Sequence, residues 1–191
     1  LLGDEQSGQI HEVGYPLYIR LLERAVTALK NGKSPELDRP LDHGTEIDLQ
    51  TPTLIPSDFL PDIHARLVMY KKIASAPDTL MLNDIEAEMI DRFGALPNPT
   101  RSLFRITELK LKAKNLGVKK IKLGGQGGRI RFSSDANVDP AKFITLIQEN
   151  SPHYQLKGPG NLQVKRTFEN IDDKVGFLED FFDKLGVPIS D

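Results

Sequence analysis

The chain has 191 residues and a formal net charge of -2, and 39% of its residues are hydrophobic. This composition can form a sizeable core, and the near-neutral charge gives no general attraction for nucleic acid or an anionic membrane. The sequence has no cysteine, which excludes disulfides, thiolate metal sites and cysteine nucleophiles. No apolar run approaches the ~20 residues that a membrane-spanning helix needs. Because the chain starts at Leu1 without a methionine or a signal-peptide pattern, we expect a monomeric fragment of a longer cytoplasmic protein.

The first third of the sequence predicts a loop, one helix and a linker with a short strand. Residues 1–14 show little hydrophobic periodicity and are predicted as loop. From Pro16 to residue 31, apolar residues recur at helical spacing. Residues 34–56 are polar and contain several prolines, which predicts a linker, and alternation around Ile47 predicts a strand within it.

Three helices are predicted next. Each has apolar residues at helical spacing, and Pro77, Gly94 and Gly117 are typical of their ends. Asn98 followed by Pro99 indicates an N-cap and the first helical position of the third helix. The apolar residues of the three helices are Ile63, Leu67, Tyr70 and Ala74; Leu82, Ile85, Met89 and Phe93; and Ile106, Leu109, Ala113 and Leu116.

Two hairpins alternate with two helices in the last third. The predicted strands are 118–123, 129–132, 154–157 and 162–168. Asp139 is predicted to begin the first helix, and Asp172 is predicted to cap the second, which ends at Gly186. The order β-β-α-β-β-α predicts an antiparallel sheet with helices on one face. We therefore predict an α+β fold in which an N-terminal helical segment precedes a helical bundle packed with this sheet unit.

A glycine-rich segment at 124–128 is a candidate phosphate-binding loop. Such a loop needs a Lys-Ser/Thr pair that opens a helix, so that backbone N–H groups face the phosphate. Here the segment leads into a strand instead, which favours a hairpin turn.

The other polar residues form no constellation for hydrolysis or metal binding. The four histidines are scattered without ligand spacing, and Ser7 does not lie in a Gly-x-Ser-x-Gly turn. We therefore predict that this chain has no catalytic residue, no metal ligand and no cofactor of its own.

A lysine-rich stretch at 110–122 provides an alternative function. Such a run can contact a phosphate backbone, which would make the chain an accessory nucleic-acid-binding module. No interleaved aromatic residues are available to stack on bases, and the overall charge is near neutral, so a solvated surface is favoured. The lysines are Lys110, Lys112, Lys114, Lys119, Lys120 and Lys122.

The second predicted helix carries acidic residues opposite its apolar side. Asp84, Glu88 and Asp91 follow at i, i+4 and i+7, a spacing that places them on one side of a helix. Glu88 can also pair with Arg92 four residues later, which favours a solvated and partly compensated surface over an interface for a basic partner.

Several separated motifs resemble those of a known family and occur in the same order along the chain as in that family. Residues 2–8, followed by 13–18, resemble the region after the RecG-like motor of bacterial transcription-repair coupling factors. Residues 55–74 resemble the start of the C-terminal domain of that family, and 88–97 resemble its most recognisable stretch. The resemblance continues to Ile121 and implies three parts. These are 1–33 as the tail of the motor, 34–56 as the linker and 57–191 as a C-terminal regulatory domain.

The resemblance implies a parent protein that is an ATP-driven translocase on duplex DNA, with ATP and Mg as the cofactors of its motor. That parent displaces stalled RNA polymerase and recruits UvrA for nucleotide excision repair. Its C-terminal domain is expected to be non-catalytic and autoinhibitory. It would dock on the N-terminal UvrA-binding module of the same polypeptide, mask it and restrain the motor.

The resemblance also implies residue roles. Glu88 and Asp91 match the acidic pair that contacts basic residues of the UvrA-binding module, and we include Asp84 and Arg92 in the expected partner-binding set. Gln6 matches the glutamine of the translocation motif. The Walker motifs of the motor are absent from this chain, so we expect no ATPase activity from it.

Overall fold

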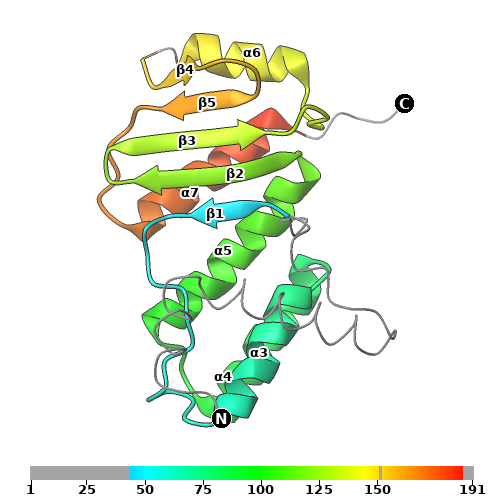
Figure 1. Ribbon diagram of the computed structural model, residues 1–191, viewed down its shortest axis with the longest axis vertical. Helices are drawn as coiled ribbons and strands as arrows, with labels where there is room; N and C mark the ends of the chain where they lie inside the picture. Colours follow the sequence, from blue (N-terminus) through cyan, green and yellow to red (C-terminus); the bar gives the residue numbers. More distant parts are fainter. Residues whose placement is uncertain (1–43, 151, 187–191) are drawn as a thin grey trace, which may run out of the picture.

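The computed structural model describes residues 44–150 and 152–186. The predicted loop and helix of 1–33, with Gln6, and residues 34–43 of the predicted linker lie outside the described residues. Figure 1 shows the strands at one end of the molecule, α3 (Ile63–Ser75) and α4 (Thr79–Phe93) at the other, and the long helix α5 (Asn98–Asn115) joining the two ends. This arrangement confirms the predicted combination of a helical bundle with a sheet unit.

The three helices of the bundle form where hydrophobic spacing predicts them. Asp62 and Asp78 cap α3 and α4, since each carboxylate accepts a hydrogen bond from a backbone N–H in the first turn. The start of α5 differs by one position from the prediction, because Asn98 is its first helical residue and Pro97 is the N-cap. Pro99 still occupies the first turn, where its missing N–H costs no helical hydrogen bond.

The sheet has five strands in the order β1-β2-β3-β5-β4. Helix α6 (Pro140–Glu149) lies between the two hairpins in sequence, and α7 (Ile171–Leu185) follows the last strand. The strands are β1 Glu46–Asp48, β2 Val118–Gly124, β3 Gly127–Phe132, β4 Tyr154–Leu156 and β5 Asn161–Val164. All pairs from β2 to β4 in this order are antiparallel, as predicted.

The short strand β1 makes the sheet mixed, because it pairs in parallel with β2. A parallel pair needs a long crossover, and α3, α4 and α5 form it here. Ile47, Leu49 and Ile55 are buried and belong to the hydrophobic clusters of the fold. The domain boundary predicted between residues 56 and 57 stays a prediction. Ile47, Leu49 and Ile55 precede that boundary in the sequence, and they pack in the same hydrophobic clusters as residues that follow it.

The glycine-rich segment forms the β2–β3 hairpin, as predicted, with Gly124 opposite Gly127. Gly127 has a φ of 98°, and a Cβ at this position would lie 2.2 Å from the carbonyl oxygen of Val164 on β5. Only glycine fits a position where the backbone has a positive φ and touches a neighbouring strand.

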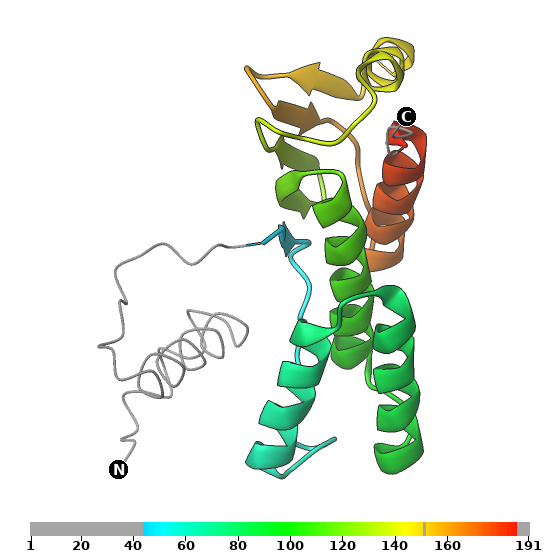
Figure 2. The same ribbon diagram turned by 90° about the vertical axis from the view of Figure 1, so that its right-hand side faces the viewer.

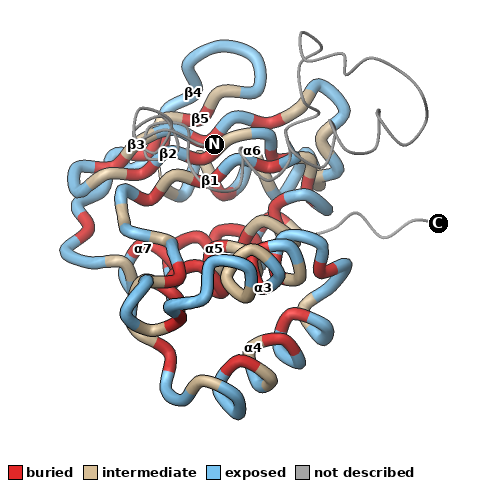
Figure 3. Tube along the Cα trace, turned by 60° about the horizontal axis from the view of Figure 1, so that its bottom comes forward, coloured by how far each residue is buried: buried red, intermediate tan, exposed pale blue. Residues whose placement is uncertain are grey.

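Two hydrophobic clusters share helix α5. The helical cluster lies between α3, α4 and the first half of α5, which contributes Leu103 and Phe104. The sheet cluster lies between the strands, α6, α7 and the second half of α5, which contributes Leu109 and Ala113. Figure 3 shows buried stretches along α5 and α7, whereas buried and exposed stretches alternate along α4.

The predicted cap of the last helix is wrong by two residues. Asn170 is the N-cap of α7, and its side-chain oxygen accepts a hydrogen bond from the Asp173 N–H at 2.9 Å. Asp172 lies inside the first turn, where its carboxylate pairs with Arg105 of α5 instead. Within 44–150 and 152–186, no helix is both long and apolar enough to cross a bilayer.

Candidate protein-interaction surface

Helix α4 presents one side to the core and the opposite side to solvent. Leu82, Ile85 and Met89 are buried in the helical cluster and fix the rotation of the helix. Residues on the opposite side are all exposed, and we call this side the α4 outer face. Its residues are Leu80, Asn83, Asp84, Ala87, Ile90 and Asp91.

Asp84 and Asp91 carry the free negative charge of the α4 outer face. Both are exposed, and neither forms a hydrogen bond or an ion pair with another residue in the described part of the chain. Seven residues, or about 10 Å along the helix axis, separate them. Packing of the buried side of α4 fixes the backbone at both aspartates, so the two carboxylates project from a helix of fixed position.

Glu88 lies on the flank of α4 that faces α3, and its carboxylate is already paired. Lys72 of α3 donates to both carboxylate oxygens at 2.9 and 2.7 Å, and Arg92 donates to Oε1 at 2.8 Å. The hydrogen bond from Lys72, followed by that from Arg92, lowers the pKa of Glu88 below its ordinary value. The predicted Glu88–Arg92 pair is thus present, and the Lys72 contact ties α3 to α4.

Arg92 is also held on its other side. Its guanidinium carbon lies 4.9 Å from the centroid of the Phe93 ring, a cation–π distance. Because Arg92 contacts both Glu88 and this ring, its charge is partly neutralised and its position is restricted.

Exposed apolar side chains lie beside the two free carboxylates. Leu80 is 77% exposed and Ile90 is 46% exposed. A single exposed leucine is ordinary, but here two exposed apolar side chains lie on the same helix face as two unpaired carboxylates.

A different acidic residue of α4 faces α5. Burial raises the pKa of Glu86, and the neighbouring Glu108 carboxylate raises it further. Glu108 in turn forms an ion pair with Lys112 at 3.2 Å. Glu86 therefore belongs to the contact between α4 and α5 and not to the outer face.

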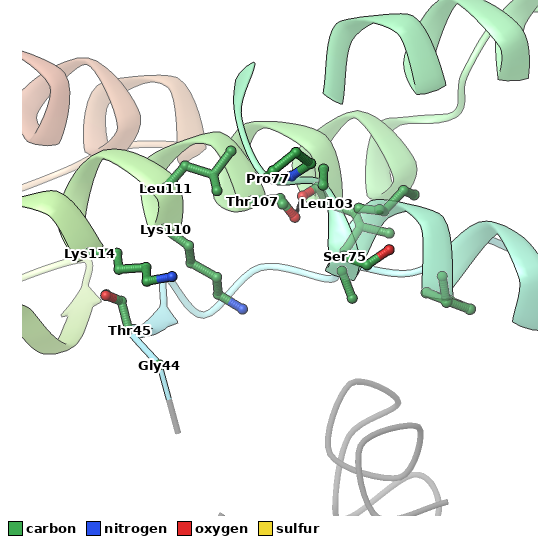
Figure 4. Close-up of a pocket in the computed structure, with 13 residues that line it drawn as sticks. Gly44, Thr45, Ser75, Pro77, Leu103, Thr107, Lys110, Leu111 and Lys114 are labelled. Atoms are coloured by element: carbon green, nitrogen blue, oxygen red, sulfur yellow. Dashed lines mark hydrogen bonds between the residues drawn. The ribbon is translucent and has the colours of Figure 1, made fainter. Parts of the chain in front are cut away.

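A concave site lies where α3, α5 and the start of β1 approach one another (Figure 4). It has a volume of about 460 Å³. Its walls combine aliphatic side chains with hydroxyl-bearing ones, and Lys110 and Lys114 of α5 lie near Thr45 at one end. The lining includes no carboxylate and no histidine. Among the described residues, no group of three or more potential metal ligands occurs.

The lysine-rich stretch spans two different elements of the fold. Lys110, Lys112 and Lys114 lie on α5, whereas Lys119, Lys120 and Lys122 lie on β2. Several of these charges are paired: Lys112 with Glu108, Lys120 with Glu46 at 2.8 Å, and Lys122 with Asp48 at 3.8 Å.

Comparison with known proteins gives consistent matches. Residues 49–143 match the family described as the TRCF domain. The chain is 41% identical over 185 residues to the transcription-repair-coupling factor of Escherichia coli (strain K12), and the match covers 97% of the chain. It is 43% identical over 180 residues, 94% of the chain, to the protein of that name from Haemophilus influenzae. The chain spans only 16% of the length of each relative.

A solved structure has the same fold. It is described as the C-terminal domain of transcription-repair coupling factor, and it superposes with a TM-score of 0.63 at 19% identity. The superposition covers 74% of this chain and 91% of the solved chain.

Proposed function

Because the chain belongs to the transcription-repair-coupling factor family, we propose that it is the C-terminal autoinhibitory domain of such a protein. The parent would use ATP and Mg to move along duplex DNA, displace stalled RNA polymerase and recruit UvrA. In this proposal the present domain docks on the N-terminal UvrA-binding module, masks it and restrains the motor. The chain itself contributes a binding surface and no chemical step.

The observation that supports this proposal most directly is the pair of unpaired carboxylates on the α4 outer face. Asp84 and Asp91 can each accept charge-assisted, bidentate hydrogen bonds from an arginine of the masked module. Neither has to release a partner in the described part of the chain before doing so. The exposed Leu80 and Ile90 would supply apolar contact beside these charges.

Glu88 can take part without losing its present contacts. A carboxylate has about four acceptor positions, and Glu88 uses two on Oε1 and one on Oε2. One position on Oε2 therefore stays available to a partner arginine. Arg92 keeps Glu88 in place and so contributes to the binding surface indirectly.

A charged interface of this kind suits a switch. Removing one member of a hydrogen-bonded charge pair that becomes buried on docking costs roughly 2–5 kcal/mol. Since about 1.4 kcal/mol changes an equilibrium constant tenfold, losing one such pair shifts the docked and released populations by more than tenfold. The proposed interface is therefore strong enough to mask the module and weak enough to open when polymerase is engaged.

The test uses the full-length parent with Asp84→Asn and Asp91→Asn together. These changes remove the two free charges without breaking the contacts of Glu88, whereas Glu88→Ala would also release Lys72. We expect at least tenfold tighter binding of UvrA and a higher basal ATPase rate.

A matched control makes the same change of charge elsewhere. Glu149 of α6 and Asp183 of α7 are exposed, and the double variant Glu149→Gln with Asp183→Asn should behave as wild type. If the Asp84/Asp91 variant binds UvrA and hydrolyses ATP like the wild type, the domain is a structural cap and the proposal fails. Direct binding of this chain to the isolated UvrA-binding module should also weaken as salt rises.

A further inference from the structure

The two faces of the sheet have opposite character. Ile47, Ile121, Ile130 and Leu162 point to the side covered by helices and are buried in the sheet cluster. Figure 2, turned by 90° from Figure 1, shows α5, α6 and α7 (green, yellow and red) on one side of the strands. Alternate residues point to the other side, which faces the viewer in Figure 1 and which no described helix covers.

We call this uncovered side the open sheet face. All of its side chains in β1 to β5 that alternate with the buried residues are polar, and four are cationic. They are Glu46, Asp48, Lys120, Lys122, Arg129, Arg131, Gln155, Asn161 and Gln163.

Strand register places the cations directly beside one another. Lys122 pairs with Arg129 across β2 and β3, and Arg129 pairs with Gln163 of β5. One step along the strands, Lys120 is opposite Arg131. Neighbours across the strands lie about 4.8 Å apart, and the two rows lie about 6.7 Å apart along each strand.

Of the four cationic side chains on the open sheet face, the two lysines form ion pairs with carboxylates of the described residues, whereas the two arginines do not. Lys120 and Lys122 pair with Glu46 and Asp48 of the edge strand β1. Among the residues that the structure describes, the one polar partner of Arg129 is a neutral amide oxygen, that of Gln163 at 3.3 Å.

Arg131 has no hydrogen bond or ion pair with any residue in 44–150 or 152–186. The two arginines thus leave the middle of the face with uncompensated positive charge. Like charges directly opposite each other destabilise a sheet, so the fold gains nothing from this placement.

The chemistry of the face fits a phosphate backbone. An arginine presents a planar fork of N–H donors that matches phosphate oxygens, and side-chain amides such as those of Asn161 and Gln163 donate to phosphate and sugar as well. The face has no aromatic side chain on which an unpaired base could stack, which favours a duplex over a single strand. It also has no exposed apolar anchor of the kind that protein partners use, and protein–DNA interfaces are the more polar and positive class.

We propose that the open sheet face binds the phosphate backbone of a nucleic-acid duplex, with Arg129 and Arg131 as its central contacts. This site is separate from the α4 outer face. It differs from the lysine-rich stretch, because the arginines of β3 and not the lysines of α5 carry the free charge.

The test measures binding of this 191-residue chain to a short fluorescein-labelled DNA duplex by fluorescence anisotropy over a series of salt concentrations. The variant is Arg129→Gln with Arg131→Gln, which keeps polar side chains on the face. We expect at least tenfold weaker binding. We also expect the slope of log affinity against log salt to become shallower by about 2, since each lost phosphate contact removes about one unit.

The matched control is Lys114→Gln with Lys142→Gln, which makes the same change of charge on α5 and α6, away from this face. It should keep the wild-type slope. Circular dichroism melting checks that both variants fold, and removal of like-charge neighbours should leave the arginine variant at least as stable as wild type. The proposal is overturned by absence of duplex binding, by an equal loss in both variants, or by equally tight binding of poly-glutamate, which would indicate an acidic protein partner.

Discussion

Replacing Met89 by alanine asks whether the two hydrophobic clusters unfold separately. Met89 is 0% exposed and lies in the helical cluster, where it joins α4 to α3 and α5. No residue of α3 or α4 belongs to the sheet cluster, and among the described helices and strands α5 alone contributes to both. Loss of packing at Met89 should therefore weaken α3 and α4 first.

The magnitude follows from the complete burial of this side chain. Replacement of a buried methionine by alanine costs roughly 2–5 kcal/mol, which includes the cavity left behind. The cluster also contains the flexible Met69, which can move into part of the space, so we expect about 3 kcal/mol. At 1.36 kcal/mol per tenfold change, this is about a 150-fold increase in the population of the opened state.

Native-state hydrogen exchange measures this opening one amide at a time. Amides of α3 and α4 in Met89→Ala should lose protection by about the factor calculated above. Amides of β2 and β3, which open only with the sheet cluster, should lose much less. Equal loss in the helices and the strands would refute the reasoning, since it would mean that α5 makes the two clusters one cooperative unit.

Two further predictions concern single polar contacts. Lys174 is 7% exposed and donates to the carbonyl oxygen of Leu49 at 2.7 Å. Lys174→Ala should therefore lower the free energy of unfolding in urea by ~1.5–3 kcal/mol, and a change below this range would contradict a structural role. Because Lys72 and Arg92 lower the pKa of Glu88, its carboxylate stabilises the fold above the ordinary glutamate pKa, and this stabilisation is lost as the pH falls through the lowered value. Wild type should melt above Glu88→Gln at neutral pH and converge with it in acid, whereas a pH-independent difference would contradict the ion-pair explanation.

Local patterns predicted the elements well, because each depends on residues close together in sequence. The recurrence of Leu82, Ile85 and Met89 specifies α4 and its buried side, and all three are buried. The glycines at 124–128 specify a hairpin because their backbone freedom is needed within the same few residues. The cap of α7 was misplaced because Asn170 and Asp172 are both good capping residues, and only the backbone decides between them.

Local sequence patterns do not predict which segments far apart in the sequence contact each other in the fold. The parallel pairing of Ile47 with Ile121 joins segments separated by three helices. The ion pair of Lys72 with Glu88 depends on how α3 packs against α4, although Glu88–Arg92, with its helical spacing, was predictable. Arg129 was predicted only as part of a strand, because its significance comes from register with other strands.

The same distinction changes how the acidic residues of α4 should be understood. In the sequence, Asp84, Glu88 and Asp91 are equivalent members of one stripe. In the fold, the Glu88 carboxylate pairs with Lys72 of α3, whereas neither aspartate carboxylate pairs with a residue in the described part of the chain. A variant of Glu88 therefore changes the bundle as well as the surface, and only the aspartates report on binding alone.

Because α5 packs in both hydrophobic clusters, it fixes the orientation of the two proposed surfaces relative to each other. The α4 outer face is held by the helical cluster and the open sheet face by the sheet cluster, and α5 runs unbroken through both. A continuous helix keeps its ends in one orientation, so a protein bound at α4 and a duplex bound at the sheet would be held at a set distance and angle. If the protein bound at the α4 outer face were released, the open sheet face would then still bind the duplex. The reason is that no side chain belongs to both surfaces.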